Sequence, residues 1–167
     1  MNTTRTRNSL VFSVLAAIFL VATPAFACSC GKPKTAKAGL KKSDSVFAGK
    51  VVAIKHVKFF RRVKVDFGNE KSKLVTASEE FHQLKFVVSR SWKGAPSRTI
   101  FVLTDFGTSC SRKYYKGQTY LVYAFKLKKP QFKSDTGLHT HMCTRTEKVS
   151  HATKDLAELG KGKISIR

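Results

Sequence analysis

The chain has 167 residues, enough for one domain with a hydrophobic core, and its 32 basic residues against 10 acidic ones give a formal charge of +22 at pH 7. Such a charge favours polyanions as partners, among them acidic polysaccharide, anionic envelope components and nucleic acid. The few carboxylates are scattered along the chain, so nothing predicts an acid–base dyad, and the H-E-x-x-H motif of zinc peptidases does not occur. We therefore expect that the protein is not an enzyme and that it uses no cofactor.

Residues 1–27 are typical of a secretory signal peptide. Arg5 and Arg7 give a positive start, residues 10–22 are apolar, and Ala25-Phe26-Ala27 matches an A-x-A cleavage site. The apolar run is short for a bilayer, which makes a membrane anchor the less favoured alternative, and residues 25–26 do not suit the usual lipoprotein motif. We therefore expect cleavage before Cys28 and a single domain over residues 28–167 without a membrane span.

Cleavage would make the product a secreted, periplasmic or extracellular protein, and we expect a monomer. Removal of Arg5 and Arg7 leaves 30 of the 32 basic residues against 10 acidic ones, a formal charge of +20. Export argues against intracellular nucleic acid as the natural partner and leaves acidic polysaccharide or an envelope polyanion.

Hydrophobic patterning predicts a mainly β domain with a helix at its end. A Lys-rich stretch over 32–44 suits a short helix or loop, and a basic stretch over 58–78, with a turn at 66–69, suits a hairpin extension. Strands are predicted over 46–56, 81–92, 98–104, 118–127 and 138–143. Val149, Ala152, Leu156 and Leu159 then follow helical spacing, with Gly160 as the stop. Five or six strands followed by a helix predict a small closed barrel.

Four cysteines, Cys28, Cys30, Cys110 and Cys143, lie in the exported part of the chain. An even number in an oxidising compartment predicts two disulfides, for which three pairings are formally possible. Pairing Cys28 with Cys30 would close a tiny strained ring, so both are expected to reach across the sequence. Metal binding by the thiols is the competing interpretation, which the lack of a C-x-x-C pair disfavours.

His139, His141 and Cys143 alternate along the last predicted strand and would share one face of it. They could ligate copper or zinc, but a disulfide would remove the thiolate and leave only two histidines. We therefore favour structural or solvent-facing histidines at this position. The stretch 107–111 superficially resembles a nucleophile turn, but it lacks the final glycine and no strand-to-helix pattern follows.

The hairpin extension carries a cluster of basic residues interleaved with Phe59 and Phe60. It could be a polyanion-binding arm or a solvated hairpin whose aromatic rings cover the barrel, and the residues alone leave both open. The basic residues of the candidate arm are Lys55, Lys58, Arg61, Arg62 and Lys64.

Taken in order, several short motifs resemble the netrin-like module of the tissue inhibitors of metalloproteinases, in particular the small bacterial proteins with this module. They are Cys28-Ser29-Cys30, Ser43-Asp44-Ser45-Val46-Phe47-Ala48-Gly49, Ser91-Trp92-Lys93-Gly94, Thr108-Ser109-Cys110, Gly117-Gln118-Thr119-Tyr120-Leu121-Val122-Tyr123-Ala124, and residues 138–143 followed by Thr144-Arg145-Thr146. The resemblance covers roughly residues 28–160. It implies an OB-fold-like five-stranded Greek-key barrel with flanking helices, and the disulfides Cys28–Cys110 and Cys30–Cys143.

The resemblance also implies a function. In these inhibitors the two disulfides hold the N-terminus as a rigid wedge, and the α-amine and carbonyl of its first residue chelate the catalytic zinc of the target peptidase. Carried over, Cys28 is the chelating residue and Ser29 points into the specificity pocket. Cys30 and Gly31 extend the wedge, and Thr108-Ser109 lies alongside it. The metal belongs to the target, so no metal site of the protein's own is expected.

The sequence differs from many animal inhibitors in two ways: it lacks a third disulfide and a further cysteine-rich domain. The alternative function is therefore a non-inhibitory binding module, which would hold acidic polysaccharide or envelope through its basic surface.

Overall fold

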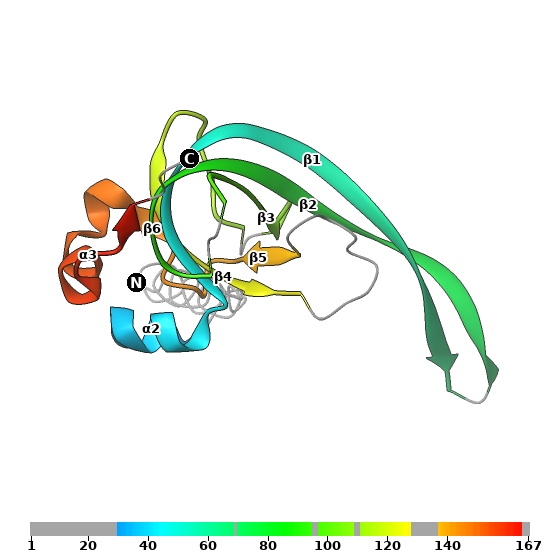
Figure 1. Cartoon of the computed structure of the whole chain (residues 1–167). Coiled ribbons are helices and arrows are strands. Elements are labelled where there is room, and N and C mark those ends of the chain that lie inside the picture. The colour runs from blue at the N-terminus through cyan, green and yellow to red at the C-terminus, as the bar shows by residue number, and fades with distance from the viewer. Residues whose placement is uncertain (1–29, 69, 95–96, 109–110, 128–136, 165–167) are drawn as a thin grey trace, which may run out of the picture.

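The structure is a computed structural model, and it describes residues 30–68, 70–94, 97–108, 111–127 and 137–164. Strands dominate it, and five of them form a ring with two short α-helices packed on one side (Figure 1). The predicted signal peptide lies outside the described residues, as do Cys28, Ser29, Ser109 and Cys110. Within the described part, no helix is long and apolar enough to cross a membrane.

The ring has the strand order of an OB-type Greek-key barrel. Around the ring the strands are β1 (Ser45–Phe67), β2 (Glu70–Lys93), β3 (Thr99–Asp105), β5 (Leu138–Thr140) and β4 (Thr119–Lys126), and β4 pairs again with β1. The β3–β5 pair is parallel and the other pairs are antiparallel. The expected fold class, a mainly β, OB-fold-like five-stranded barrel with a C-terminal flanking helix, is confirmed.

Short elements complete the domain. They are α2 (Ala36–Lys42), β6 (Glu147–Lys148), the 3₁₀ helix η1 (Val149–His151), α3 (Thr153–Leu159) and β7 (Lys163–Ile164). β6 pairs with β4, and β7 pairs with β2. α2 falls inside the Lys-rich stretch, and its N-cap is Thr35, whose hydroxyl accepts from the Ala38 N–H at 3.1 Å.

The hydrophobic core has two parts because β4 is buried on both faces. Side chains that alternate along the strands fill the ring, among them Phe47, Leu84, Phe86, Val102, Tyr120 and Val122. On the outer face, Val46, Leu121 and Tyr123 pack with Ala152 under the helices, and Leu40, Trp92, Leu156 and Leu159 border them. The apolar run of β4 thus reflects a strand buried between the barrel interior and the helices.

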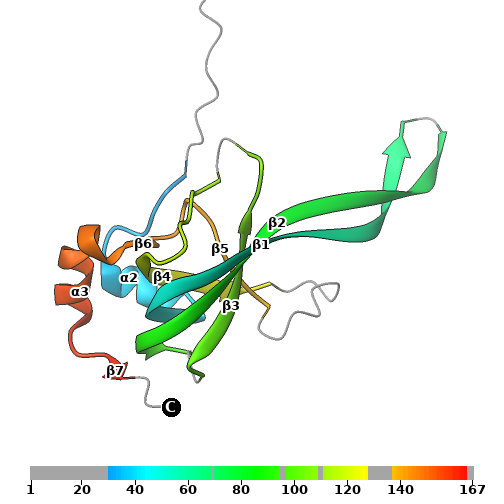
Figure 2. The same cartoon turned by 90° about the horizontal axis from the view of Figure 1, so that it is seen from above.

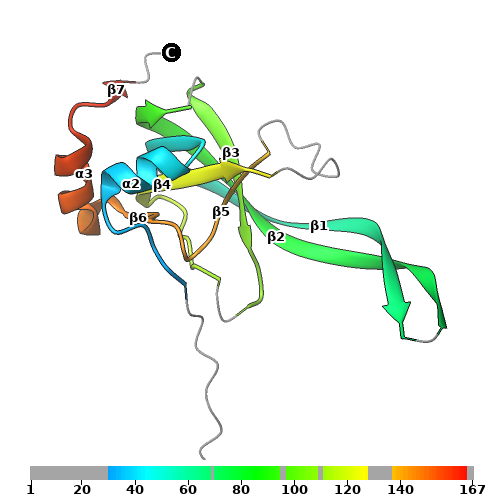
Figure 3. The ribbon, with the colours of Figure 1, turned by 90° about the horizontal axis from the view of Figure 1, so that it is seen from below.

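Beyond the ring, β1 and β2 continue together as a two-stranded projection, here called the arm (residues 57–80). β3 accompanies β2 only as far as the Phe81↔Asp105 pair, whereas β1 and β2 stay in unbroken register from Ala53↔Lys85 to Val65↔Lys73. Gly68, with φ +70°, turns the chain at the tip. Figures 1 to 3 show the arm leaving the barrel on the side away from α2 and α3. The predicted hairpin extension is confirmed.

Two predicted elements differ from the structure. The strand expected over 138–143 ends at Thr140, because the backbone N–H and the hydroxyl of Thr144 both donate to the His141 carbonyl and turn the chain. The helix expected from Val149 is divided, because Ala152 has φ −99° and ψ 19° and separates η1 from α3. Gly160, with φ 68°, ends α3 as expected.

We expect Leu84→Ala to lower the free energy of unfolding by about 3 kcal/mol, because it opens a cavity among fully buried side chains. Urea denaturation followed by circular dichroism would measure this. Leu74→Ala is the matched control on the same strand, since Leu74 is 70% exposed, and it should change the stability by less than about 0.5 kcal/mol. Equal losses in both variants would contradict the assignment of the core.

Candidate functional site

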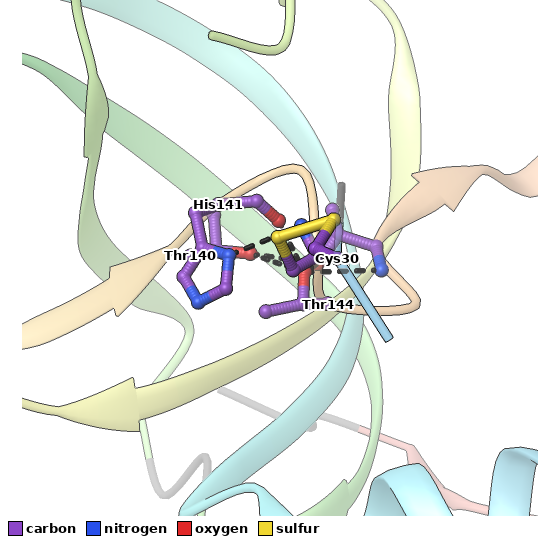
Figure 4. The surroundings of a disulfide bond; sticks show 6 residues. Cys30, Thr140, His141 and Thr144 are labelled. Atoms are coloured by element: carbon purple, nitrogen blue, oxygen red, sulfur yellow. Dashed lines mark hydrogen bonds between the residues drawn. A yellow bond between two sulfur atoms is a disulfide. The ribbon is translucent and has the colours of Figure 1, made fainter. Parts of the chain in front are cut away.

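The described N-terminal segment, residues 30–35, is tied to the C-terminal part of the barrel. A disulfide joins Cys30 to Cys143 across 113 residues, with 5.4 Å between the two Cα atoms. Cys143 lies in the turn that follows β5, and its N–H donates to His141 Nδ1 at 3.0 Å. Figure 4 shows Cys30, Thr140, His141 and Thr144 gathered around the disulfide. The bridge between Cys30 and Cys143, expected from the resemblance, is confirmed.

Beneath the disulfide, three buried threonine hydroxyls hold the turn against β4. Thr140 Oγ1 lies 2.8 Å from Thr146 Oγ1 and 3.0 Å from Thr144 Oγ1, and it donates to the Tyr123 carbonyl at 3.0 Å. The Tyr123 N–H donates to Thr146 Oγ1 at 2.9 Å. Because buried polar groups are stable only when they are paired, this network favours one geometry for the turn that carries Cys143.

Arg145 makes a second connection to the N-terminal segment. Its Nη1 donates to the carbonyl of Pro33 at 2.7 Å and to that of Lys34 at 3.3 Å. Its Nε donates to Asp155 Oδ2 at 2.8 Å, and its Nη2 donates to Asp155 Oδ1. Tyr123 also donates to Asp155 Oδ2, at 3.1 Å. One guanidinium thus joins the N-terminal segment to α3.

The electrostatics of this junction stabilise the charged pair. The hydrogen bond to Asp155 raises the pKa of Arg145 above its ordinary value. Burial, and then the negative charge of Asp155, raise the pKa of the Tyr123 hydroxyl, which therefore stays protonated and available as a donor.

α2 is held in place by α3. Glu158 on α3 accepts from the N–H groups of Ala36 at 2.9 Å and Lys37 at 3.0 Å, and these bonds lower the pKa of Glu158. They satisfy two of the donors that the first turn of α2 cannot pair within the helix. α2 also packs closely against β4, since a Cβ on Gly39 would lie 2.9 Å from the Tyr123 ring.

The predicted wedge is described in part. Gly31 is exposed, and among the described residues other than its chain neighbours no atom lies within 4 Å of where its Cβ would be. Thr108 is exposed, and its N–H donates to Ser111 Oγ at 3.1 Å. Cys28, Ser29 and Ser109 lie outside the described residues, and the Cys28–Cys110 pairing stays a prediction.

An ion pair connects the β3–β4 loop to the strand beside the N-terminal segment. Arg112 Nη1 lies 3.1 Å from Glu147 Oε2, and Lys32 lines the same surface depression as Glu147. Burial tends to raise the pKa of Glu147, but the Lys148 N–H and Arg112 outweigh it, so the pKa is lowered. The ion pair thereby connects Arg112 to β6.

The two histidines considered as metal ligands have protein partners. His139 is buried, and its Nε2 lies 3.1 Å from Asp105 Oδ1, while His141 accepts from the Cys143 N–H. Both rings pack edge-on against Phe125, at 5.4 and 5.3 Å between centroids. Cys143 is in the disulfide, and no group of three or more potential ligands stands together anywhere in the described ranges.

The basic residues proposed for the arm lie on both faces of the paired strands. Alternate residues of a strand point to opposite faces, so Lys58, Arg62 and Lys64 share one face of the arm. Lys55, opposite Gln83, lies on the other face. The side chain of Arg61 is outside what the structure describes. Polyanion binding by these basic residues stays a prediction.

Sequence reasoning missed a group of rings at the root of the arm. Phe106, just after β3, lies between His56 of β1 and His82 of β2, with centroid distances of 4.3 Å to His56 and 4.7 Å to His82. Glu80 bonds His56 Nε2 at 3.1 Å and Lys58 Nζ at 3.0 Å. Only the predicted pairing of β1 with β2 could have placed the histidines opposite each other, and nothing in the sequence pointed to Phe106.

The sequence matches no protein-family model and no curated protein closely enough to show a family.

We expect Arg145→Gln to lower the free energy of unfolding by about 2 kcal/mol, because it removes charge-assisted hydrogen bonds from the buried Asp155 carboxylate. Hydrogen exchange should also become faster at the amides of Lys34 and Thr35, next to the carbonyls that lose their donor. Arg98→Gln, at an exposed arginine, is the control and should leave both measurements unchanged. Unchanged exchange in Arg145→Gln would contradict the role of Arg145 in fixing the segment.

Proposed function

We propose that the protein is a secreted inhibitor of zinc metallopeptidases that acts through its mature N-terminus. Cys28 would supply the α-amine and the carbonyl to the zinc of the target, and Ser29 would point into the specificity pocket. The observation that supports this proposal is the tethering of residues 30–35 by the Cys30–Cys143 disulfide and by Arg145. The same features agree with the netrin-like resemblance of the sequence.

The proposed chemistry requires a segment that is ordered before it binds. A catalytic zinc keeps a coordination position that water occupies, and an amine and a carbonyl of one residue can replace that water as a five-membered chelate. Ordering a free chain terminus on binding would cost affinity, whereas a segment already held two residues away loses less entropy. Gly31 is exposed, which suits a partner that approaches along the segment.

The proposed inhibitor acts as a monomer outside the cytoplasm and needs no cofactor of its own. Thr108 and Ser109 would lie alongside the wedge and contact the rim of the target site. The peptidase contributes the only metal in the complex.

We expect protein that begins at Cys28 to inhibit members of a panel of extracellular zinc metallopeptidases. Inhibition should weaken as the pH falls below about 7, because protonation removes the lone pair of an α-amine that ordinarily titrates near pH 8. A variant with one alanine before Cys28 should lose inhibition, whereas one with an alanine added after Arg167 should keep it. Equal inhibition by both variants, or none by the unmodified protein across the panel, would reject the mechanism.

A second function is supported by the arm. Lys58, Arg62 and Lys64 are exposed on one face of a projection that stands clear of the barrel, which suits the binding of an acidic polysaccharide or envelope polyanion. This function is independent of the N-terminus, because the arm and the helices lie on opposite sides of the barrel (Figure 2).

We expect binding to immobilised heparin to weaken steeply between about 50 and 200 mM salt, because exposed charges interact through a screened field. Peptidase inhibition should change little over the same range. Salt-independent retention on heparin would argue against a charge-driven arm, and salt-sensitive inhibition would argue against chelation.

A further inference from the structure

We propose that the arm binds acidic polysaccharide along one continuous strip, in which the rings of Phe106 and Phe60 contact sugar rings and the cations of the arm contact the acidic groups. This inference rests on the second proposed function and adds to it the contact of aromatic side chains with the sugar rings of the ligand. The strip is defined as Phe106, His56, His82, Glu80, Lys58, Phe60, Arg62 and Lys64.

The strip exists because the inner face of the barrel continues onto one face of the arm. Ile54 and Leu84 are opposite each other at the edge of the core, and the register continues without a bulge to Lys64↔Leu74. Side chains two residues apart therefore follow one another on the same face, beginning with His56 after Ile54. At roughly 3.3 Å per residue, the eight steps from His56 to Lys64 cover about 26 Å.

At the root of the strip, three rings come from β1, from β2 and from the residue that follows β3. Phe106 is 37% exposed and is flanked by His56 and His82, whose ring centroids lie 6.3 Å apart. Farther out, Phe60 is 66% exposed, and Lys58 Nζ lies 5.7 Å from its ring centroid. Exposed aromatic rings with a cation above them offer both an apolar face and a positive charge to one ligand.

The charges of the strip favour a ligand that carries hydroxyl groups as well as anions. Lys58, Arg62 and Lys64 supply the positive charge, but Glu80, about one-third exposed, lies among them and bonds both His56 and Lys58. The hydrogen bond from Lys58 holds the pKa of Glu80 below its ordinary value, so the carboxylate stays charged near neutral pH. A carboxylate repels a dense polyanion such as polyphosphate, whereas it accepts hydrogen bonds from sugar hydroxyls.

The strip is better suited to a separate ligand than to a second copy of the chain. The mature protein carries a formal charge of about +20, because 30 of the 32 basic residues and all 10 acidic ones lie after residue 27, and two copies would repel each other. A polysaccharide whose acidic groups lie on its rings complements both the cations and the exposed aromatic faces.

The test measures binding of the mature protein, at about 50 mM salt, to three probes by calorimetry: a polygalacturonate fragment, a polyphosphate of similar charge and an oligothymidylate. Phe106→Ala should weaken polygalacturonate binding about fivefold, equivalent to about 1 kcal/mol, and change polyphosphate binding less than twofold. The double variant Arg62→Gln with Lys64→Gln should weaken both about tenfold or more.

Matched controls lie elsewhere on the surface. Lys55→Gln removes one charge from the same strand but the opposite face, and Tyr115→Ala removes an exposed ring that also has a lysine above it. Each should change polygalacturonate binding less than twofold. Phe106→Leu keeps the apolar volume without the aromatic face, so it should weaken binding as Phe106→Ala does even if the alanine variant is unstable.

Three outcomes would overturn the inference. Equal binding of polygalacturonate and polyphosphate, with no effect of Phe106→Ala, would show binding by charge alone and would leave the second proposed function intact. If oligothymidylate bound more tightly than polygalacturonate, and Phe106→Ala removed that binding, the aromatic side chains of the strip would be shown to contact nucleic-acid bases. No binding of any probe would reject the polyanion function together with the strip.

Discussion

The ion pair between Arg145 and Asp155 connects three parts of the molecule that are far apart in the sequence. Asp155 belongs to α3, Arg145 follows the turn that carries Cys143, and the carbonyls of Pro33 and Lys34 belong to the N-terminal segment. A carboxylate that is 92% buried is stable only with a charged partner, so the position of α3 depends on Arg145. The remaining donor of the same guanidinium then determines where residues 33–34 lie. The guanidinium that pairs the buried charge of Asp155 therefore also fixes the position of the N-terminal segment.

Several contacts act on that segment together, and they differ in chemistry. The disulfide is covalent, the bonds from Arg145 are charge-assisted, and Glu158 pairs the first amides of α2. Loss of one of them would loosen the segment where that contact acts and would leave the other contacts in place. This combined support is the physical reason for proposing a function for the segment.

The sequence predicted the elements whose signal is periodic and local. The strands of the ring, the hairpin extension and the stop at Gly160 follow from alternation and from turn residues. The strand over 138–143 was predicted too long because Thr144 carries no strong turn signal, and its hydroxyl bonds the His141 carbonyl only in the folded chain. The prediction of one continuous helix from Val149 was wrong for a related reason, since apolar spacing does not show a break in the backbone at Ala152.

The candidate sites also contain some features that the sequence predicts and others that exist only in the folded chain. The Cys30–Cys143 pairing came from a resemblance spanning most of the chain, not from the spacing of the cysteines, which allowed other pairings. The split of Lys55 from Lys58 follows from strand alternation, but the contact of Phe106 with His56 and His82 needs three strands in place. The Arg145–Asp155 pair joins residues ten apart across the break at Ala152, a geometry that no local pattern contains.

The topology of the ring also determines the order in which the molecule can assemble. β1 needs β4 to close the ring, β3 needs β5 as its parallel neighbour, and Cys30 needs Cys143. Contacts between residues so far apart in sequence form slowly, because long loops must close before any stabilisation is gained. β1 and β2, joined by a tight turn, can pair early, whereas the N-terminal segment must wait until the last quarter of the chain is available. The N-terminal segment is therefore among the last parts of the molecule to reach its final position, and it acquires its fixed geometry only in a fully folded molecule.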